Sequence, residues 1–322
     1  MFTKIRKTVR GRECIAVSGL GAYKIDDTLE CGQAFRYERV CAQEQYTEYV
    51  VPIEKKLVSV GQHTPGELLF FSVDDDFFER KIVPFFSLDT DYAKINTQIS
   101  RTTDSEWMKR AAESAVGVAI LRQDAWETLF SFIVSQNNNI PRIRKILFSI
   151  CRAYGENTAA SLERCPLGKH AVRPCDKACA DCGICYSFPT PDDILAAPEK
   201  MLSSKPGFRY KYLLAAAEAV KSGDVDLKKI SATGDYGYTV NELKKIKGVG
   251  DKVASCVALF GFGNLEAFPI DVWVKKAIND YFGGHLNYNS FGKYAGIAQQ
   301  YIFHYIRNLE KISPLSQSDS SD

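Results

Sequence analysis

The hydrophobic pattern of the chain changes near residue 115. Before that point, short runs rich in aromatic and β-branched residues alternate with polar or turn-like segments, as in antiparallel strands; the runs are AFRYERV (34–40), QYTEYVVPI (45–53), KLVSVGQ (56–62) and ELLFFSV (67–73). After it, apolar residues recur with helical spacing over 124–136, 143–153, 211–221, 240–247, 252–261, 272–282 and 290–308. The pattern predicts an α+β fold, with a β-rich N-terminal domain over 1–112, a mostly helical domain over 113–312 and a disordered polar tail over 313–322.

Net charge and composition say little about partners. The net charge is +2 and the pI is near 7.9, whereas nucleic-acid-binding domains often exceed a pI of about 9. A nucleic-acid interface must therefore be local, and the basic segments are KIRKTVRGR (4–12) and KPGFRYKY (205–212); a solvated face explains either equally well. The sequence has no apolar run of about 18 residues and no signal-peptide pattern, which predicts a cytoplasmic protein in a prokaryote or a nuclear one in a eukaryote.

The segment IKGVGDKVA (246–254) has the form of a helix–hairpin–helix. One helix ends over 242–247, Gly248, Val249 and Gly250 make the tight turn, and a second helix begins near Asp251. The N–H groups that open the second helix can bind a phosphate. The spacing fits neither a P-loop nor a dinucleotide fingerprint, so the backbone phosphate of a nucleic acid is the better candidate. A glycine-capped junction without a ligand is the alternative.

Lys252 stands in the first turn of that second helix. The positive end of the helix dipole lies there, so the position is unfavourable for a lysine. The same field, together with burial, disfavours the ammonium form, and an uncharged lysine is a nucleophile. The alternative is that its flexible stem carries the charge out to solvent.

Asp271 follows Pro269 and precedes an apolar helical segment, which predicts an N-cap. Capping alone is a sufficient role for an isolated aspartate. Beside a nucleophilic lysine and a phosphate-binding turn, the carboxylate can also stabilise a developing oxocarbenium charge and help deprotonate the amine. Together the three features suit attack at the C1′ carbon of a sugar.

Five stretches of the chain resemble the 8-oxoguanine DNA glycosylase family of the helix–hairpin–helix superfamily. They are ECGQAFRY (30–37), LRQDAWETLFSFIVSQNNNIPRI (121–143), PGFRYKY (206–212), GVGDKVASC (248–256) with FPIDV (268–272) and, more weakly, YAGIAQQYIF (294–303). The resemblance covers nearly the whole chain. It implies a TBP-like β-sheet domain before a helix–hairpin–helix catalytic domain, in which Lys252 is the Schiff-base nucleophile and Asp271 the catalytic aspartate. It also implies a monomer that acts on double-stranded DNA containing 8-oxoguanine and needs no cofactor for catalysis.

Four residues resemble the pocket that receives the extruded base. Cys256 and Phe303 correspond to its walls, and Gln299 to the reader of the Watson–Crick edge. Gly32 corresponds to the residue whose carbonyl accepts the N7 hydrogen that distinguishes 8-oxoguanine from guanine. Core packing is the alternative for Cys256 and Phe303, and a helix-surface amide is the alternative for Gln299.

Four further residues resemble the family's contacts with the distorted duplex. Asn137, Arg142 and Arg209 correspond to residues that fill the vacated space and read the opposite cytosine, and Phe208 corresponds to the wedge that bends the DNA. Base extrusion leaves an orphaned partner that amide and guanidinium groups can satisfy, and an aromatic ring can fill the stack. The three asparagines of SQNNNIPR also predict a helix end; a plain polar loop is the alternative. The sequence departs from the family at Trp273, where members often have a histidine.

An insertion over 165–185 holds five of the ten cysteines, four of them spaced C-x3-C-x2-C-x2-C. Reduced thiols at this spacing suit a structural zinc or an iron–sulfur cluster, and a loop without metal is the third possibility. The family resemblance does not supply this feature. The candidate ligands are Cys165, Cys175, Cys179, Cys182 and Cys185.

These features predict a bifunctional DNA glycosylase and abasic-site lyase that excises 8-oxoguanine through a lysine Schiff base and β-elimination. One alternative is a related glycosylase for another damaged base, such as an oxidised pyrimidine or an alkylated purine. Alkylpurine members generally lack the lysine, so Lys252 argues against them. The other is a non-catalytic DNA-binding protein, against which Lys252 and Asp271 together argue.

Overall fold

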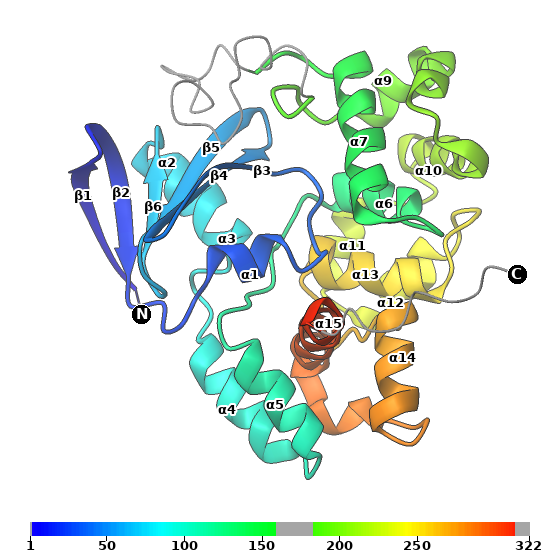
Figure 1. The fold of residues 1–322 in the computed structure, drawn as a ribbon. Coiled ribbons are helices and arrows are strands. Elements are labelled where there is room, and N and C mark those ends of the chain that lie inside the picture. Colours follow the sequence, from blue (N-terminus) through cyan, green and yellow to red (C-terminus); the bar gives the residue numbers. More distant parts are fainter. Residues whose placement is uncertain (1, 159–182, 313–322) are drawn as a thin grey trace, which may run out of the picture.

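The computed structural model describes residues 2–158 and 183–312 of the chain. A β-sheet lies at one side, and helices make up the rest of the molecule (Figure 1). None of the helices in the described part is long and apolar enough to cross a membrane. The tail over 313–322, which the sequence predicts to be disordered, falls outside the described residues.

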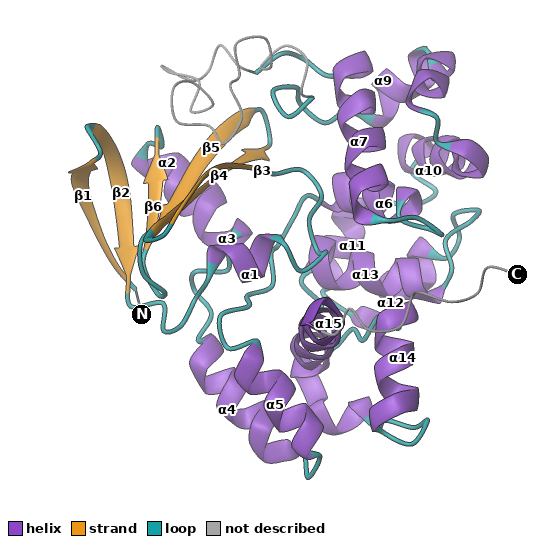
Figure 2. Cartoon of the chain, viewed as in Figure 1, coloured by secondary structure: helices purple, strands orange, loops and turns teal. Residues whose placement is uncertain are grey.

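The sheet is antiparallel and six-stranded, with the order β1-β2-β6-β5-β4-β3 (Figure 2). The four expected strand runs correspond to β3–β6. The first two strands were not expected. The first, β1, is an edge strand exposed along most of its length and so lacks an apolar face, whereas the central residues of β2 are buried. The bounds are β1 (Thr3–Val9), β2 (Arg12–Ser18), β3 (Glu38–Gln43), β4 (Tyr46–Ile53), β5 (Lys56–Gln62) and β6 (Leu68–Phe71).

Both faces of the sheet bury apolar residues, and they face two different cores. In β2, Ile15 and Val17 join the large core that the sheet shares with the helices, whereas Cys14 and Ala16 point to a small cluster on the other face. The alternation follows the two-residue period of a strand. The sheet is therefore attached to the helical part through one continuous apolar core.

Helices also occur within the expected β-rich region. They are α1 (Ile25–Leu29), α2 (Asp75–Phe77), the π-helical η1 (Phe78–Ile82), α3 (Val83–Phe85), α4 (Tyr92–Thr102) and α5 (Glu106–Ser114). Helices α4 and α5 were not predicted, although Asp91 and Ser105 cap their N-termini with side-chain hydrogen bonds. The expected domain boundary after residue 112 falls inside α5.

The remaining helices of the described part include seven that follow the predicted periodic segments and two short ones, α9 (Pro191–Ala196) and α11 (Leu227–Thr233), that were not predicted. The seven are α6 (Ala125–Val134), α7 (Ile140–Tyr154), α10 (Tyr210–Ser222), α12 (Tyr236–Leu243), α13 (Asp251–Phe262), α14 (Val272–Tyr281) and α15 (Ala295–Ile312), with 3-10 turns η3 (Pro198–Ser204), η4 (Gly207–Arg209) and η5 (Tyr288–Tyr294). Helix α13 packs on α6, and α15 packs on α5 and α14. Figure 1 shows α15 near the centre, between the sheet side and the hairpin helices.

Candidate active site and nucleic-acid interface

The predicted hairpin is the connection between α12 and α13. Gly248 has φ of +91°, and a Cβ atom there would lie 2.3 Å from the Tyr212 ring, so only glycine fits. Its carbonyl oxygen accepts a 2.6 Å hydrogen bond from Gln136 Nε2. Gly250 is the N-cap of α13 and supplies no side-chain cap. The first N–H groups of α13 therefore have no side-chain acceptor and remain available to an anion.

Lys252 lies in the first turn of α13 and is half-buried. Its Nζ atom is 3.4 Å from Ser135 Oγ, at the end of α6, and 5.1 Å from the centroid of the Phe132 ring. The side chain thus turns back toward α6 instead of extending into solvent. Ser135 and Phe132 were not predicted as neighbours of the lysine, because they lie more than a hundred residues earlier in the chain.

Asp271 is the N-cap of α14, as predicted. Its Oδ1 atom accepts from the N–H groups of Trp273 at 3.0 Å and Val274 at 2.8 Å. Burial raises the pKa of the Asp271 carboxyl above its ordinary range, although these N–H groups and the positive charges of Lys252 and Arg307 oppose the rise. The hairpin lysine is therefore close enough to the capping aspartate for its charge to lower the pKa of the carboxyl.

Cys256 follows Lys252 by one helical turn and is buried. Burial raises the pKa of its thiol to about 11, while the nearby Lys252 lowers it. The thiol is therefore neutral at physiological pH. It presents a small apolar surface next to the lysine instead of a second nucleophile.

Gly32 and Phe303 meet although they lie at opposite ends of the sequence. Gly32 has φ of +80°, and a Cβ atom there would lie 3.2 Å from two carbon atoms of the Phe303 ring. The guanidinium of Arg307 lies 5.2 Å from the centroid of the same ring. One turn before Phe303, the buried Gln299 accepts a 2.9 Å hydrogen bond from Gln300 Nε2. The loop after α1 and helix α15 thus bring together three of the four predicted pocket residues.

The predicted duplex-contact residues gather around the turn after α6. Asn137 has φ of +46° and is exposed. Arg209 is buried, and its guanidinium donates to the carbonyl oxygens of Gln136, Asn137 (2.8 Å) and Pro206 (3.2 Å). Burial lowers the pKa of Arg209, and the nearby charge of Arg142 adds to the effect. Arg209 therefore holds the turn through its backbone, a role that the sequence analysis did not foresee.

Phe208 is half exposed and is anchored on one side. Its ring lies 4.5 Å from the Arg209 guanidinium and meets the Tyr212 ring edge-on, with centroids 6.2 Å apart. The same Tyr212 ring lies against Gly248. The exposed ring and the hairpin turn are therefore parts of one packed surface.

A cavity of about 640 Å³ opens beside the hairpin. Lys252 and Ile270 line it, together with the rings of Tyr236, Phe268 and Tyr288. The Phe268 and Tyr288 rings stack with centroids 4.7 Å apart. The sequence analysis missed these aromatic residues, which are scattered over more than fifty positions. Gly32, Cys256, Gln299 and Phe303 are not among its lining residues.

The basic N-terminal segment is largely neutralised. Lys4 and Arg6 pair with Asp75 at 3.2 and 2.7 Å, and Lys7 pairs with Glu67 at 2.7 Å. These ion pairs favour the interpretation of KIRKTVRGR as a solvated face.

Trp273, the departure from the family pattern, is half-buried against the large core.

The metal prediction is only partly covered by the structure. Cys165, Cys175, Cys179 and Cys182 lie outside the described residues, whereas Cys185 is described and buried. Within the described ranges, no three histidine, cysteine or acidic side chains are grouped to hold a metal ion.

Comparison with known proteins gives a consistent result. Residues 19–129 match the family model of the 8-oxoguanine DNA glycosylase N-terminal domain. The N-glycosylase/DNA lyase of Saccharomyces cerevisiae is 29% identical over 79% of this chain and 67% of its own length. The structure of MBOgg1 in complex with a low-affinity DNA ligand is 30% identical, with a TM-score of 0.79 over 96% of this chain and 99% of that chain. The Clostridium acetobutylicum 8-oxoguanine glycosylase/lyase, in complex with duplex DNA containing cytosine opposite 8-oxoguanine, is also 30% identical, with a TM-score of 0.78 over 96% of this chain and 98% of that chain.

Proposed function

Because the chain belongs to the 8-oxoguanine DNA glycosylase family, we propose that it excises 8-oxoguanine from duplex DNA and then cleaves the resulting abasic site. The observation that carries the proposal is the presence of Lys252, at an uncapped helix start, within electrostatic reach of the half-buried carboxylate of Asp271. A lysine and an aspartate so arranged suit covalent attack at a sugar carbon. A protein that only binds DNA needs neither group.

The chemistry assigned to Lys252 is a displacement followed by an elimination. The amine attacks C1′, the bond from C1′ to the purine N9 breaks, and the departing base takes up a proton. Loss of the amine protons and opening of the sugar ring give an imine between Lys252 and C1′. Removal of a C2′ proton then breaks the bond from C3′ to its phosphate oxygen, and hydrolysis of the imine frees the lysine. Asp271 accepts a proton from the amine and stabilises the positive charge that develops at C1′.

The pocket roles follow the family pattern. Cys256 and Phe303 sandwich the extruded base, Gln299 reads its Watson–Crick edge, and the Gly32 carbonyl accepts the N7 hydrogen. The burial of Gln299 and the contact of Gly32 with Phe303 support these roles. Glycine suits this contact, because a side chain at position 32 would be strained at a φ of +80° and would press on the Phe303 ring.

The DNA contacts are assigned to two surfaces. The amides at the start of α13, after Gly248, Val249 and Gly250, hold a backbone phosphate of the damaged strand. Asn137 and Arg142 reach the opposite cytosine, Phe208 wedges the stack, and Arg209 keeps Asn137 in place. The exposure of Asn137, Arg142 and Phe208 supports this division of roles.

Borohydride trapping tests the nucleophile. The parent protein should release base from an 8-oxoguanine duplex with cytosine opposite, and borohydride should link it covalently to the DNA. The K252Q variant should bind the lesion duplex yet show no trapping. K276Q, which alters an exposed lysine paired with Asp280 on α14, should behave as the parent. Trapping by K252Q would show that another amine is the nucleophile.

A substrate panel tests the lesion. Duplexes containing 8-oxoguanine, thymine glycol or ethenoadenine, each opposite all four bases, should show excision of 8-oxoguanine first. Preference for thymine glycol or ethenoadenine would assign the protein to another damaged base. Release from no substrate would favour a binding protein.

A structural metal in the Cys-rich insertion remains part of the proposal. The cysteine spacing supports it, since four thiolates satisfy a tetrahedral zinc site and also an iron–sulfur cluster. Metal analysis and the visible absorption spectrum of purified protein distinguish the two. Protein with neither zinc nor a visible band would show that the insertion folds without metal.

A further inference from the structure

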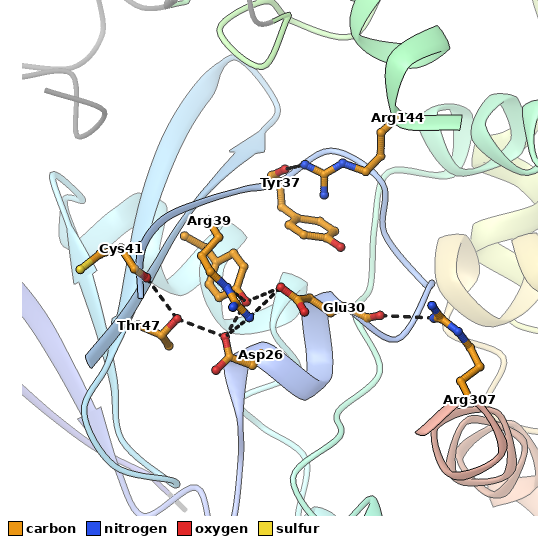
Figure 3. Close-up of polar contacts among 9 residues, drawn as sticks. Asp26, Glu30, Tyr37, Arg39, Cys41, Thr47, Arg144 and Arg307 are labelled. Atoms are coloured by element: carbon orange, nitrogen blue, oxygen red, sulfur yellow. Dashed lines mark hydrogen bonds and ion pairs between the residues drawn. The ribbon is translucent and has the colours of Figure 1, made fainter. Parts of the chain in front are cut away.

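Arg307 lies one helical turn after Phe303 and contacts two parts of the candidate pocket. Its guanidinium is 5.2 Å from the Phe303 ring centroid, and Nη1 lies 3.5 Å from the carbonyl oxygen of Glu30. Glu30 ends α1, two residues before Gly32. The arginine therefore links α15 to the main chain at the end of α1 (Figure 3).

Other cations occupy the nearby carboxylates. Arg39 Nη2 lies 3.1 Å from Asp26 Oδ1 and 2.8 Å from Glu30 Oε1, and the Tyr49 hydroxyl donates to both acids. In Figure 3 these contacts cluster on the sheet side of α1, whereas Arg307 approaches from α15 and meets the carbonyl of Glu30. The α1 acids are thus paired within the N-terminal part, and Arg307 meets the main chain next to Gly32.

Arg307 also contributes charge to the reacting centre. The Trp273 and Val274 N–H groups of α14 donate to the Asp271 carboxylate. The charges of Lys252 on α13 and Arg307 on α15 lower the pKa of its carboxyl, and Asp271 in turn raises the pKa of the Cys256 thiol. Lys252 and Arg307 are the cations among these groups. When Lys252 loses its charge to become a nucleophile, Arg307 is the cation left facing the carboxylate.

Building on the proposed function, we propose that Arg307 is a positioning residue for excision, which holds Phe303 against the Gly32 loop. This effect concerns only substrates that carry a base. The positive charge of Arg307, which lowers the pKa of the Asp271 carboxyl, adds a second effect on every step that needs the ionised carboxylate. The two effects therefore separate by substrate and by pH.

Single-turnover rates of R307M and R307K test the proposal, on an 8-oxoguanine duplex and on a duplex with a preformed abasic site, between pH 5 and 8. At pH 8, R307M should excise 8-oxoguanine about five- to tenfold more slowly, because it loses the ring contact and the hydrogen bond. Its incision of the abasic site at pH 8 should change less than about twofold, because that substrate has no base to hold. R307K keeps the charge and should recover most of the excision rate.

The pH profile gives a readout that packing alone would not change. Loss of the Arg307 charge removes an influence that lowers the pKa of Asp271. Activity that needs the carboxylate falls as pH falls through this pKa. The acid limb of the pH–rate profile of R307M should therefore move to higher pH on both substrates. R307K should keep the parental limb. R101M, which removes an exposed arginine of α4, should match the parent throughout.

Two results would overturn the proposal. One is parental excision and an unshifted acid limb in R307M. The other is an equal loss on both substrates at every pH with a lowered melting temperature, which would make Arg307 a general stabilising residue. If the parent protein itself fails to excise 8-oxoguanine, the proposed function is wrong; if the parent excises and R307M matches it, only the role of Arg307 is wrong.

Discussion

The Arg209 guanidinium donates a 2.8 Å hydrogen bond to the carbonyl oxygen of Asn137. The same group also binds the carbonyls of Gln136 and Pro206, so a buried charge closes the turn after α6 against η4. Asn137 has a positive φ, which is uncommon outside glycine. The turn keeps this conformation because Arg209 ties its main chain to a second segment.

Replacement of Arg209 should therefore affect folding, whereas replacement of Arg142 should affect DNA binding. R209M leaves three carbonyls, buried or partly buried, without this donor and should lower the free energy of unfolding by about 2–4 kcal/mol in urea titrations. R142M alters an exposed side chain and should stay within about 0.5 kcal/mol of the parent. Its affinity for the lesion duplex should fall, which fluorescence anisotropy measures. Equal stability of the two variants would contradict this division.

Gly32 offers a matched test of the pocket. G32A combines a strained backbone at φ of +80° with a methyl group 3.2 Å from the Phe303 ring, whereas G223A has the same strain at φ of +83° in open space. Both should lose about 1–2 kcal/mol of unfolding free energy from the strained backbone. Only G32A should lose excision of 8-oxoguanine while it still cleaves a preformed abasic site. Similar excision by both would mean that Gly32 does not shape the pocket.

The two hairpin glycines should respond differently to alanine. A methyl group on Gly248 would overlap the Tyr212 ring at a φ of +91°, whereas one on Gly250 meets no atom within 4 Å. G248A should therefore lose about 2–4 kcal/mol of unfolding free energy, because backbone strain and overpacking add. G250A should change stability by less than about 1 kcal/mol. Urea unfolding monitored by fluorescence separates them, and equal losses would show that Tyr212 moves aside.

The ionised carboxylate of Asp271 should lower the stability of the folded chain at neutral pH while it supports activity. Its pKa is raised in the folded state, so the folded chain binds the proton more tightly than the unfolded chain, in which the pKa is about 3.9. The favourable contribution of the protonated group is present below that value and is lost as pH rises through the higher folded-state pKa.

D271N removes this pH dependence, and asparagine caps a helix as well as aspartate does. At pH 7 the variant should be at least as stable as the parent, while single-turnover excision falls by at least about a hundredfold. Thermal unfolding from pH 3 to 7 checks the first expectation, and excision kinetics checks the second. A clear loss of stability at pH 7 would show that the charged carboxylate stabilises the fold.

Local sequence signals predicted the hairpin, the Asp271 cap and most helices of the second half. Each depends on spacing within one or two turns, which sequence carries directly. The edge strand β1 and the helices α4 and α5 were not predicted. The strand β1 has no buried face, and the clearest local signals of α4 and α5 are their caps, Asp91 and Ser105. Long-range neighbours such as Ser135 beside Lys252, or Arg209 beside Asn137, depend on tertiary packing. The position of Arg307, four residues after Phe303, was the one local clue to its role.

The contact between Gly32 and Phe303 can form only after α15, the last helix of the described chain, has been synthesised. Lys252 and Asp271 precede α15 in the chain, so a nascent polypeptide that ends before residue 295 already contains both proposed chemical groups. It lacks Gln299 and Phe303, so the contact between Gly32 and the Phe303 ring cannot form. The groups assigned to recognise the base are therefore completed last, and a prematurely ended chain would carry the reactive lysine without the pocket that selects its target.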